Sequence, residues 1–257
     1  MDLSVFYSYL YDRIHSKIFT KEDVSNYINE LIDFLELNEY LSEIVFTPDR
    51  YANMAAYNLG DRKIKVALQA IINEARMTLN MMKRKPDNNG MINAFILETL
   101  LHEITHIYHN YLITECDNDI SKVFRMQLEY FYSDDPFKLE QYDFYYNKLI
   151  FERDASITAI ENILRIIMKY SNDKQLYKYY YKELKKFILT GYKEYKDRVL
   201  SPIEVIQSEI FPTEPLIVEN IDLYDKFRLG FMVSKEEYSY FKENIDEIIL
   251  SKNNLHS

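Results

Sequence analysis

The sequence of 257 residues is poor in residues that cross-link or interrupt a chain. It has one cysteine, Cys116, so it cannot form an internal disulfide, which suits a reducing compartment without proving one. Only four glycines and six prolines occur, and this scarcity favours long helices with few tight turns. Tryptophan is absent, whereas the 24 tyrosines are most simply assigned to amphipathic packing.

Long hydrophobic runs are also missing. No stretch reaches the roughly 18 apolar residues that a helix needs to cross a bilayer. The segment 1–11 has a short apolar run but lacks a basic leader and a small-residue cleavage site, and Asp12 and Arg13 end it. We therefore expect a cytoplasmic protein with no membrane partner.

Basic residues are outnumbered, since 31 Lys and Arg against 41 Asp and Glu give a formal net charge of −10. This charge disfavours nucleic acids and anionic membranes as partners. Lysines and tyrosines alternate between residues 174 and 186, a mixture that can bind single-stranded nucleic acid, but a solvated basic face is the simpler interpretation. With 47% hydrophobic and 28% charged residues, the composition is that of a soluble globular protein of unspecified oligomeric state.

Three of the five histidines lie in the segment 98–111, which contains an H-E-x-x-H pattern from His102 to His106. Residues four apart on a helix lie on one face, one turn apart. The imidazoles of His102 and His106 can therefore bind one metal ion, while Glu103 holds a water beside it. Zinc is the metal that this pattern favours. The alternative is a surface helix whose histidines have no function.

The residues around this pattern support a helix with two distinct sides. Ligand-type residues gather on one side and apolar residues on the other. A core helix with incidental histidines would not usually place them all opposite its apolar stripe. The polar side comprises Glu98, Thr99, His102, His106 and His109, and the apolar side comprises Ile96, Leu97, Leu100, Ile104, Ile107, Tyr108 and Tyr111.

The segment resembles the active-site helix of the zincin metallopeptidases. A catalytic zinc needs three protein ligands and one open position, so a third ligand has to come from elsewhere. The metzincin pattern would require a histidine six residues after His106, but position 112 is leucine, and that subclass is excluded. Glutamate is the alternative ligand, and the candidates further along the chain are Glu129, Glu140, Glu152 and Glu161.

Glu152 is the third ligand that we favour. It opens a predicted long helix in which the small residues Ala155, Ser156 and Ala159 lie on or beside its face, and small residues let two helices approach closely. Glu152-Arg-Asp-Ala155 also resembles the Glu-x-x-Ala segment that follows the zinc helix in small gluzincins, including ImmA/IrrE-like and phage-encoded metallopeptidases. The alternative is a first-turn glutamate that interacts with its helix dipole.

Two further residues share the polar side of the metal helix. His109 could contact the metal, its ligands or the substrate, but an exposed histidine without such a role is the simplest interpretation. Glu98, one turn before His102, could orient that imidazole. A solvated glutamate is again the simpler alternative.

The predicted elements indicate an α+β, predominantly helical protein with a zincin-like core, in which a small β-hairpin packs on the active-site helix. We predict amino-terminal helices in residues 1–40, a catalytic core in 41–170 and a helical extension in 171–257. Within the core, a helix is expected over 69–82, and the active-site helix is expected to start near Met91.

The hairpin is predicted from two β-prone runs, Tyr51–Tyr57 and Lys63–Leu68, which flank the turn-type residues 58–61. In zincins, a strand just before the active-site helix lines the cleft and pairs with extended substrate. An ordinary hairpin that covers the core fits these residues equally well.

The resemblance implies a zinc-dependent endopeptidase that hydrolyses peptide bonds of an intracellular protein or peptide. Zinc bound by His102, His106 and Glu152 would activate a water, and Glu103 would take the proton of that water. A deformylase-like hydrolase would need a cysteine ligand upstream of the helix, whereas Cys116 lies downstream. A zinc-fold protein that binds or regulates a partner without catalysis stays open as an alternative.

Overall fold

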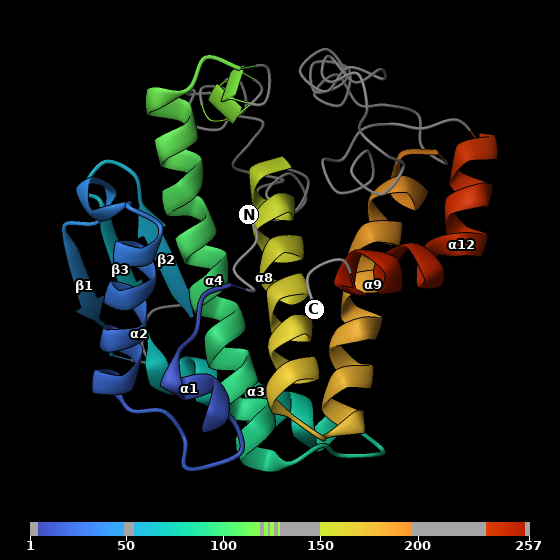
Figure 1. Ribbon diagram of the computed structural model, residues 1–257, viewed down its shortest axis with the longest axis horizontal. Helices are drawn as coiled ribbons and strands as arrows, with labels where there is room; N and C mark the ends of the chain where they lie inside the picture. The colour runs from blue at the N-terminus through green and yellow to red at the C-terminus, as the bar shows by residue number, and fades with distance from the viewer. Residues whose placement is uncertain are drawn as a thin grey trace. The chain divides into compact units, whose positions relative to one another are not determined.

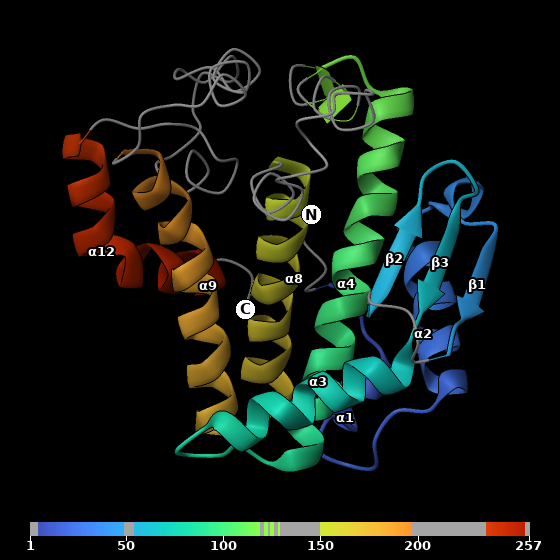
Figure 2. The same cartoon turned by 180° about the vertical axis from the view of Figure 1, so that it is seen from behind.

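The computed structural model describes residues 5–48, 54–118, 121–122, 124–125, 128, 150–196 and 235–254. In this part of the chain the protein is predominantly helical with one three-stranded sheet, as the α+β prediction requires. Figures 1 and 2 show the elements from opposite sides.

Two helices open the chain, as predicted, but the first is very short. α1 spans Tyr9–Asp12, and α2 spans Lys21–Phe34. A capping box begins α2: Thr20 Oγ1 accepts the Asp23 N–H, and the Asp23 carboxylate accepts the Thr20 N–H. A single 3₁₀ turn, Asn38–Tyr40, leads into the sheet.

The sheet has the order β1-β3-β2, from strands Glu43–Phe46 (β1), Ala55–Asn58 (β2) and Lys63–Val66 (β3). β2 and β3 form the predicted antiparallel hairpin, and β1 joins β3 in parallel. In this described sheet β2 is an edge strand. Both views show α4 alongside β2, and α2 against one face of the sheet (Figures 1 and 2).

α3 spans Leu68–Met81, in agreement with the predicted helix over 69–82. α4 spans Asn88–Glu115 and begins three residues earlier than predicted. The reason is that Asp87 caps it: the Met91 N–H donates to the Asp87 carbonyl, and the Gly90 N–H donates to the Asp87 carboxylate. Six apolar residues of the middle of α4 have no solvent exposure or almost none: Ile96, Leu97, Leu100, Leu101, Ile104 and Ile107.

The carboxyl-terminal half contributes α8 (Ile150–Tyr170), α9 (Lys174–Lys196) and α12 (Lys235–Asn254). The sequence Ser234-Lys-Glu-Glu237 has the pattern of a capping box and falls at the start of α12, but Ser234 itself lies outside the described residues. α12 buries Phe241, Ile245 and Ile249, which recur every four residues along one side of the helix.

The chain divides into two compact units. One comprises Met1–Tyr111 and Thr158–Glu183, and the other comprises Leu112–Ile157 and Leu184–Ser257. The boundaries fall inside α4, α8 and α9, so each of these continuous helices contributes residues to both units. The three-part organisation expected from the sequence stays a prediction.

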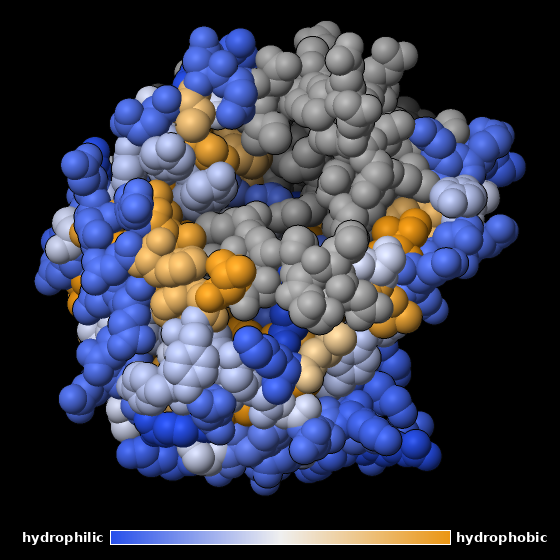
Figure 3. Space-filling view, viewed as in Figure 1, coloured by the Kyte–Doolittle hydropathy of each residue, from blue (hydrophilic) through white to orange (hydrophobic). Residues whose placement is uncertain are grey.

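Most of the coloured surface in Figure 3 is hydrophilic, and hydrophobic side chains appear in several separate patches of it. Among the described helices, none combines the length and the hydrophobicity that crossing a membrane requires.

Candidate metal centre

His102 and His106 stand one turn apart on α4, as the helical pattern predicts. Their Nε2 atoms are 3.0 Å apart, and their ring planes meet at 81°. Two nitrogens bound to one tetrahedral zinc at about 2.0–2.1 Å lie about 3.4 Å apart. The imidazoles therefore already converge on one point and would need to separate only slightly to bind an ion.

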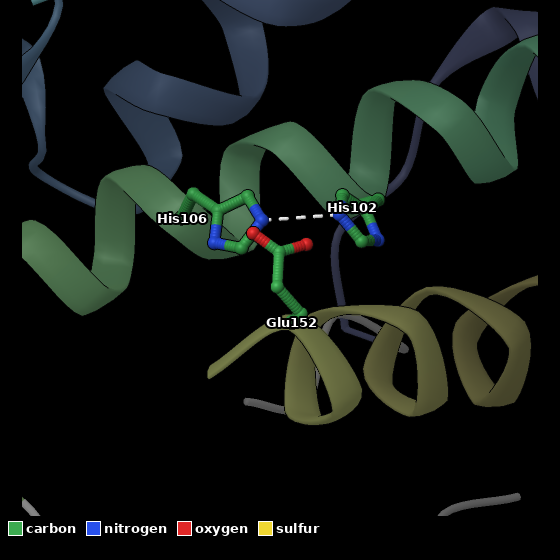
Figure 4. A group of neighbouring side chains, drawn as sticks. All are labelled: His102, His106 and Glu152. Carbon is green, nitrogen blue, oxygen red and sulfur yellow. Dashed lines mark hydrogen bonds between the residues drawn. The ribbon is translucent and has the colours of Figure 1, made fainter. Parts of the chain in front are cut away.

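Glu152 joins this pair. One ligand atom from each of His102, His106 and Glu152 lies within 4.8 Å of the other two, so the group could hold a metal ion. Figure 4 shows the Glu152 carboxylate reaching from the first turn of α8 toward the two imidazoles. Ala155 and Ala159 are fully buried on the same helix, in keeping with the small residues expected around this carboxylate.

The alternative glutamate ligands do not join the group where they are described. Glu161 lies on α8 and is buried, but it is not part of the cluster. Glu129 and Glu140 lie outside the described residues. Cys116 follows the end of α4 and does not belong to the group either.

Glu103, the predicted proton acceptor, is 7% exposed. Its Oε2 accepts a hydrogen bond of 2.6 Å from the backbone N–H of Tyr57, on edge strand β2. The phenol of Tyr57 in turn donates to the Tyr40 carbonyl at 2.7 Å and accepts from Asn110 Nδ2 at 2.9 Å. Two residues, Glu103 and Asn110, thus connect α4 to β2.

Tyr57 and Asn110 were missed by sequence reasoning. Asn110 lies seven residues after Glu103, so the two share a side of α4, and a polar residue at that position was the only available signal. Nothing in the sequence pairs Glu103 with a strand residue 46 positions earlier.

Glu98 is half-buried, whereas a solvated glutamate would be exposed. Burial raises the pKa of the Glu98 carboxyl to about 7, while the Tyr180 phenol and the nearby His102 act in the opposite direction. Glu98 and His102 therefore influence each other electrostatically. The predicted role of Glu98 in orienting His102 stays a prediction.

His109 is 3% exposed, so its interpretation as an exposed histidine is wrong. Its ring meets the His106 ring edge-on, with centroids 5.5 Å apart. The error has a physical cause: the polar side of α4 is partly covered, since His106 and His109 are buried whereas Glu98, Thr99 and His102 are half-buried. Periodicity reports which residues share a side of a helix and not whether that side meets solvent.

Comparisons of the chain with protein-family models, curated proteins and solved structures found no match.

Proposed function

We propose that the protein is a zinc-dependent endopeptidase of the zincin type, which hydrolyses peptide bonds of a protein or peptide substrate. The observation that supports this proposal most directly is the convergence of His102, His106 and Glu152. Two imidazoles and one carboxylate form the ligand set of many catalytic zinc sites and leave a fourth position open.

In this proposal His102, His106 and Glu152 hold the ion. When bound, zinc would supply a Lewis acid that polarises the scissile carbonyl and acidifies a water molecule. Glu103 takes a proton from the attacking water and passes it to the leaving amine. The Tyr57 N–H holds one carboxylate oxygen, Oε2, and leaves Oε1 for the proton transfer.

The position of β2 supports an extended substrate. It is an edge strand of the described sheet, and the Tyr57 N–H on its outer side reaches Glu103. An extended peptide that pairs with an edge strand uses backbone hydrogen bonds for affinity. Because Glu103 accepts the Tyr57 N–H, a peptide that pairs with the remaining outward-facing groups of β2 would run beside the proton acceptor.

The proposal is tested by metal analysis of the purified protein followed by digestion of a peptide library. We expect about one zinc per chain and cleavage that a chelator abolishes. Glu103→Gln should keep the zinc and lose turnover by about 10²-fold or more. Full activity of Glu103→Gln would contradict the mechanism. Bound zinc without cleavage of any peptide would instead indicate a binding or regulatory protein.

A further inference from the structure

A second cluster of chemically active side chains lies away from the metal ligands in sequence and shares no residue with them. It joins His15, which follows α1, to Asp87, which precedes α4, and to Ser171, between α8 and α9. All three belong to the compact unit formed by Met1–Tyr111 and Thr158–Glu183. Nothing in the proposed peptidase mechanism uses them.

The three side chains form a relay. His15 Nε2 is 2.6 Å from Ser171 Oγ, and His15 Nδ1 is 3.3 Å from Asp87 Oδ2. These are the contacts that join nucleophile to base and base to orienting carboxylate in serine hydrolases. The arrangement is recognised by such geometry and not by the order of residues in the chain.

The hydrogen-bond pattern fits the protonation state that a serine nucleophile needs. In the state in which Asp87 is a carboxylate and the imidazole is neutral, Asp87 can only accept, so His15 Nδ1 carries the hydrogen and Nε2 is an acceptor. The Ser171 hydroxyl must then donate to Nε2. Ser171 Oγ also accepts the backbone N–H of Asp173 at 3.1 Å, a contact that stabilises negative charge on this oxygen.

The orienting carboxylate is itself held in place. Asp87 Oδ2 accepts the Gly90 N–H at 2.7 Å, and the Asp87 N–H donates to Asp173 Oδ2, also at 2.7 Å. Gly90 is required beside the imidazole, because a Cβ there would lie 2.6 Å from His15 Nδ1. A glycine in a helix costs up to about 1 kcal/mol relative to alanine, so this space for His15 is kept at some expense of helix stability.

The cluster is open to a reagent from solution. The side chain of His15 is 34% exposed and that of Asp87 is 48% exposed. Two carboxylates adjoin the relay, since Asp87 contacts His15 and the Asp173 carboxylate accepts the Asp87 N–H, so an anionic substrate would be repelled. A neutral or cationic ester is the class of substrate that fits this charge.

We propose that Ser171 is a nucleophilic serine that accepts acyl groups from neutral or cationic esters, with His15 as its base and Asp87 orienting His15. Ser171 Oγ attacks the ester carbonyl carbon, and its proton passes to His15 Nε2. The bond from this carbon to the alcohol oxygen then breaks, and His15 protonates the departing alcohol. Water, deprotonated by His15, finally attacks the acyl–serine, which releases the carboxylic acid and restores Ser171.

The test uses the full chain with a chelator present, so that the metal site cannot contribute. A neutral fluorophosphonate probe is added, and the labelled residue is mapped by mass spectrometry. We expect labelling of Ser171 in the wild type, and acetylation of the same residue by p-nitrophenyl acetate. His15→Ala and Asp87→Asn should each slow labelling by about 10²-fold or more.

Ser16, the residue after His15, provides the matched control. It is an exposed serine whose hydroxyl donates to the Arg13 carbonyl and not to an imidazole. Ser16→Ala should label like the wild type. Gly90→Ala should slow labelling without removing any of the three side chains, since it displaces the imidazole. Far-UV circular dichroism shows which variants are folded. The proposal would be overturned if the wild-type protein were labelled no faster at Ser171 than at Ser16. It would also be overturned if folded His15→Ala were labelled at Ser171 as fast as the wild type.

Discussion

The backbone N–H of Tyr57 donates a hydrogen bond of 2.6 Å to Oε2 of Glu103. This bond joins an edge strand to the residue that we propose as proton acceptor, and it comes from a backbone group that no side-chain substitution removes except proline. The backbone N–H of Tyr57 points away from β3. The Met54 carbonyl accepts the Ala67 N–H next to β3, and in an antiparallel pair only every second residue bonds to the partner strand, so Tyr57, three residues after Met54, does not. Proline at position 57 would therefore leave the strand pairing intact.

Tyr57→Pro and Tyr57→Ala form a pair of variants that isolates this hydrogen bond, because both lack the phenol and only proline lacks the N–H. If Glu103 needs the bond to hold its orientation, kcat should be about 10-fold lower in Tyr57→Pro than in Tyr57→Ala, with similar KM and zinc content. Peptide hydrolysis by the two proteins measures this ratio. Equal kcat values would show that the N–H does not position Glu103.

Asn110 should stabilise the contact between α4 and β2. It is 9% exposed and donates from Nδ2 to the Tyr57 phenol at 2.9 Å. Asn110→Ala should lower the free energy of unfolding by about 1–2 kcal/mol, because a buried hydrogen bond is lost. In a double-mutant cycle with Tyr57→Phe, urea denaturation should give a coupling energy of about 0.5–1.5 kcal/mol. Additive effects would show that the two side chains do not interact.

The raised pKa of Glu98 predicts that the stability of the metal-free protein falls as the pH rises toward 7. Burial raises the pKa of Glu98 from the ordinary 4.5 to about 7, so the folded state holds a proton that the unfolded state releases. The contribution of Glu98 to stability is therefore complete below about pH 4.5 and is lost as the pH rises toward 7.

Glu98→Gln removes this titration and keeps a similar shape. At pH 8 the variant should be more stable than the wild type by about 1–3 kcal/mol, and its stability should change less between pH 5 and pH 8. Urea denaturation at both pH values provides the measurement. Glu30→Gln, at an exposed position of α2, is the control and should follow the wild type. If the stability of Glu98→Gln depended on pH as that of the wild type does, the pH dependence would not come from Glu98.

Glu152 and Glu161 offer a matched test of the third ligand. Both are glutamates of α8 and both are 8% exposed, but only Glu152 joins the histidine pair. Glu152→Gln should weaken zinc binding by about 10-fold or more, whereas Glu161→Gln should leave it unchanged. Competition with a chromophoric chelator measures both affinities. A larger loss of zinc affinity in Glu161→Gln than in Glu152→Gln would show that Glu152 is not the third ligand.

The parts of this protein that the sequence could predict depend on contacts between near neighbours in the chain. Helical spacing located α3 and placed His102 and His106 on one side of α4, and turn residues located the hairpin. Small residues around Glu152 correctly indicated that α8 carries the carboxylate of the cluster. Each of these features leaves a short-range pattern of side-chain size or polarity.

The features that the sequence did not predict depend on long-range packing. The bond from Tyr57 to Glu103 spans 46 positions, and that from Ser171 to His15 spans 156. Periodicity cannot reveal whether a side of a helix is covered by other elements. For this reason the sequence did not predict that His109 is buried. The early start of α4 was missed because Asp87 stands within a run of loop-type residues.

Anomalous X-ray diffraction at the zinc absorption edge, from crystals of the zinc-loaded protein, tests whether His102, His106 and Glu152 bind one zinc ion. We expect a single strong peak about 2.0–2.2 Å from Nε2 of both histidines and from a carboxylate oxygen of Glu152. A protein that takes up no zinc, or a peak away from these three residues, would contradict zinc binding by this cluster.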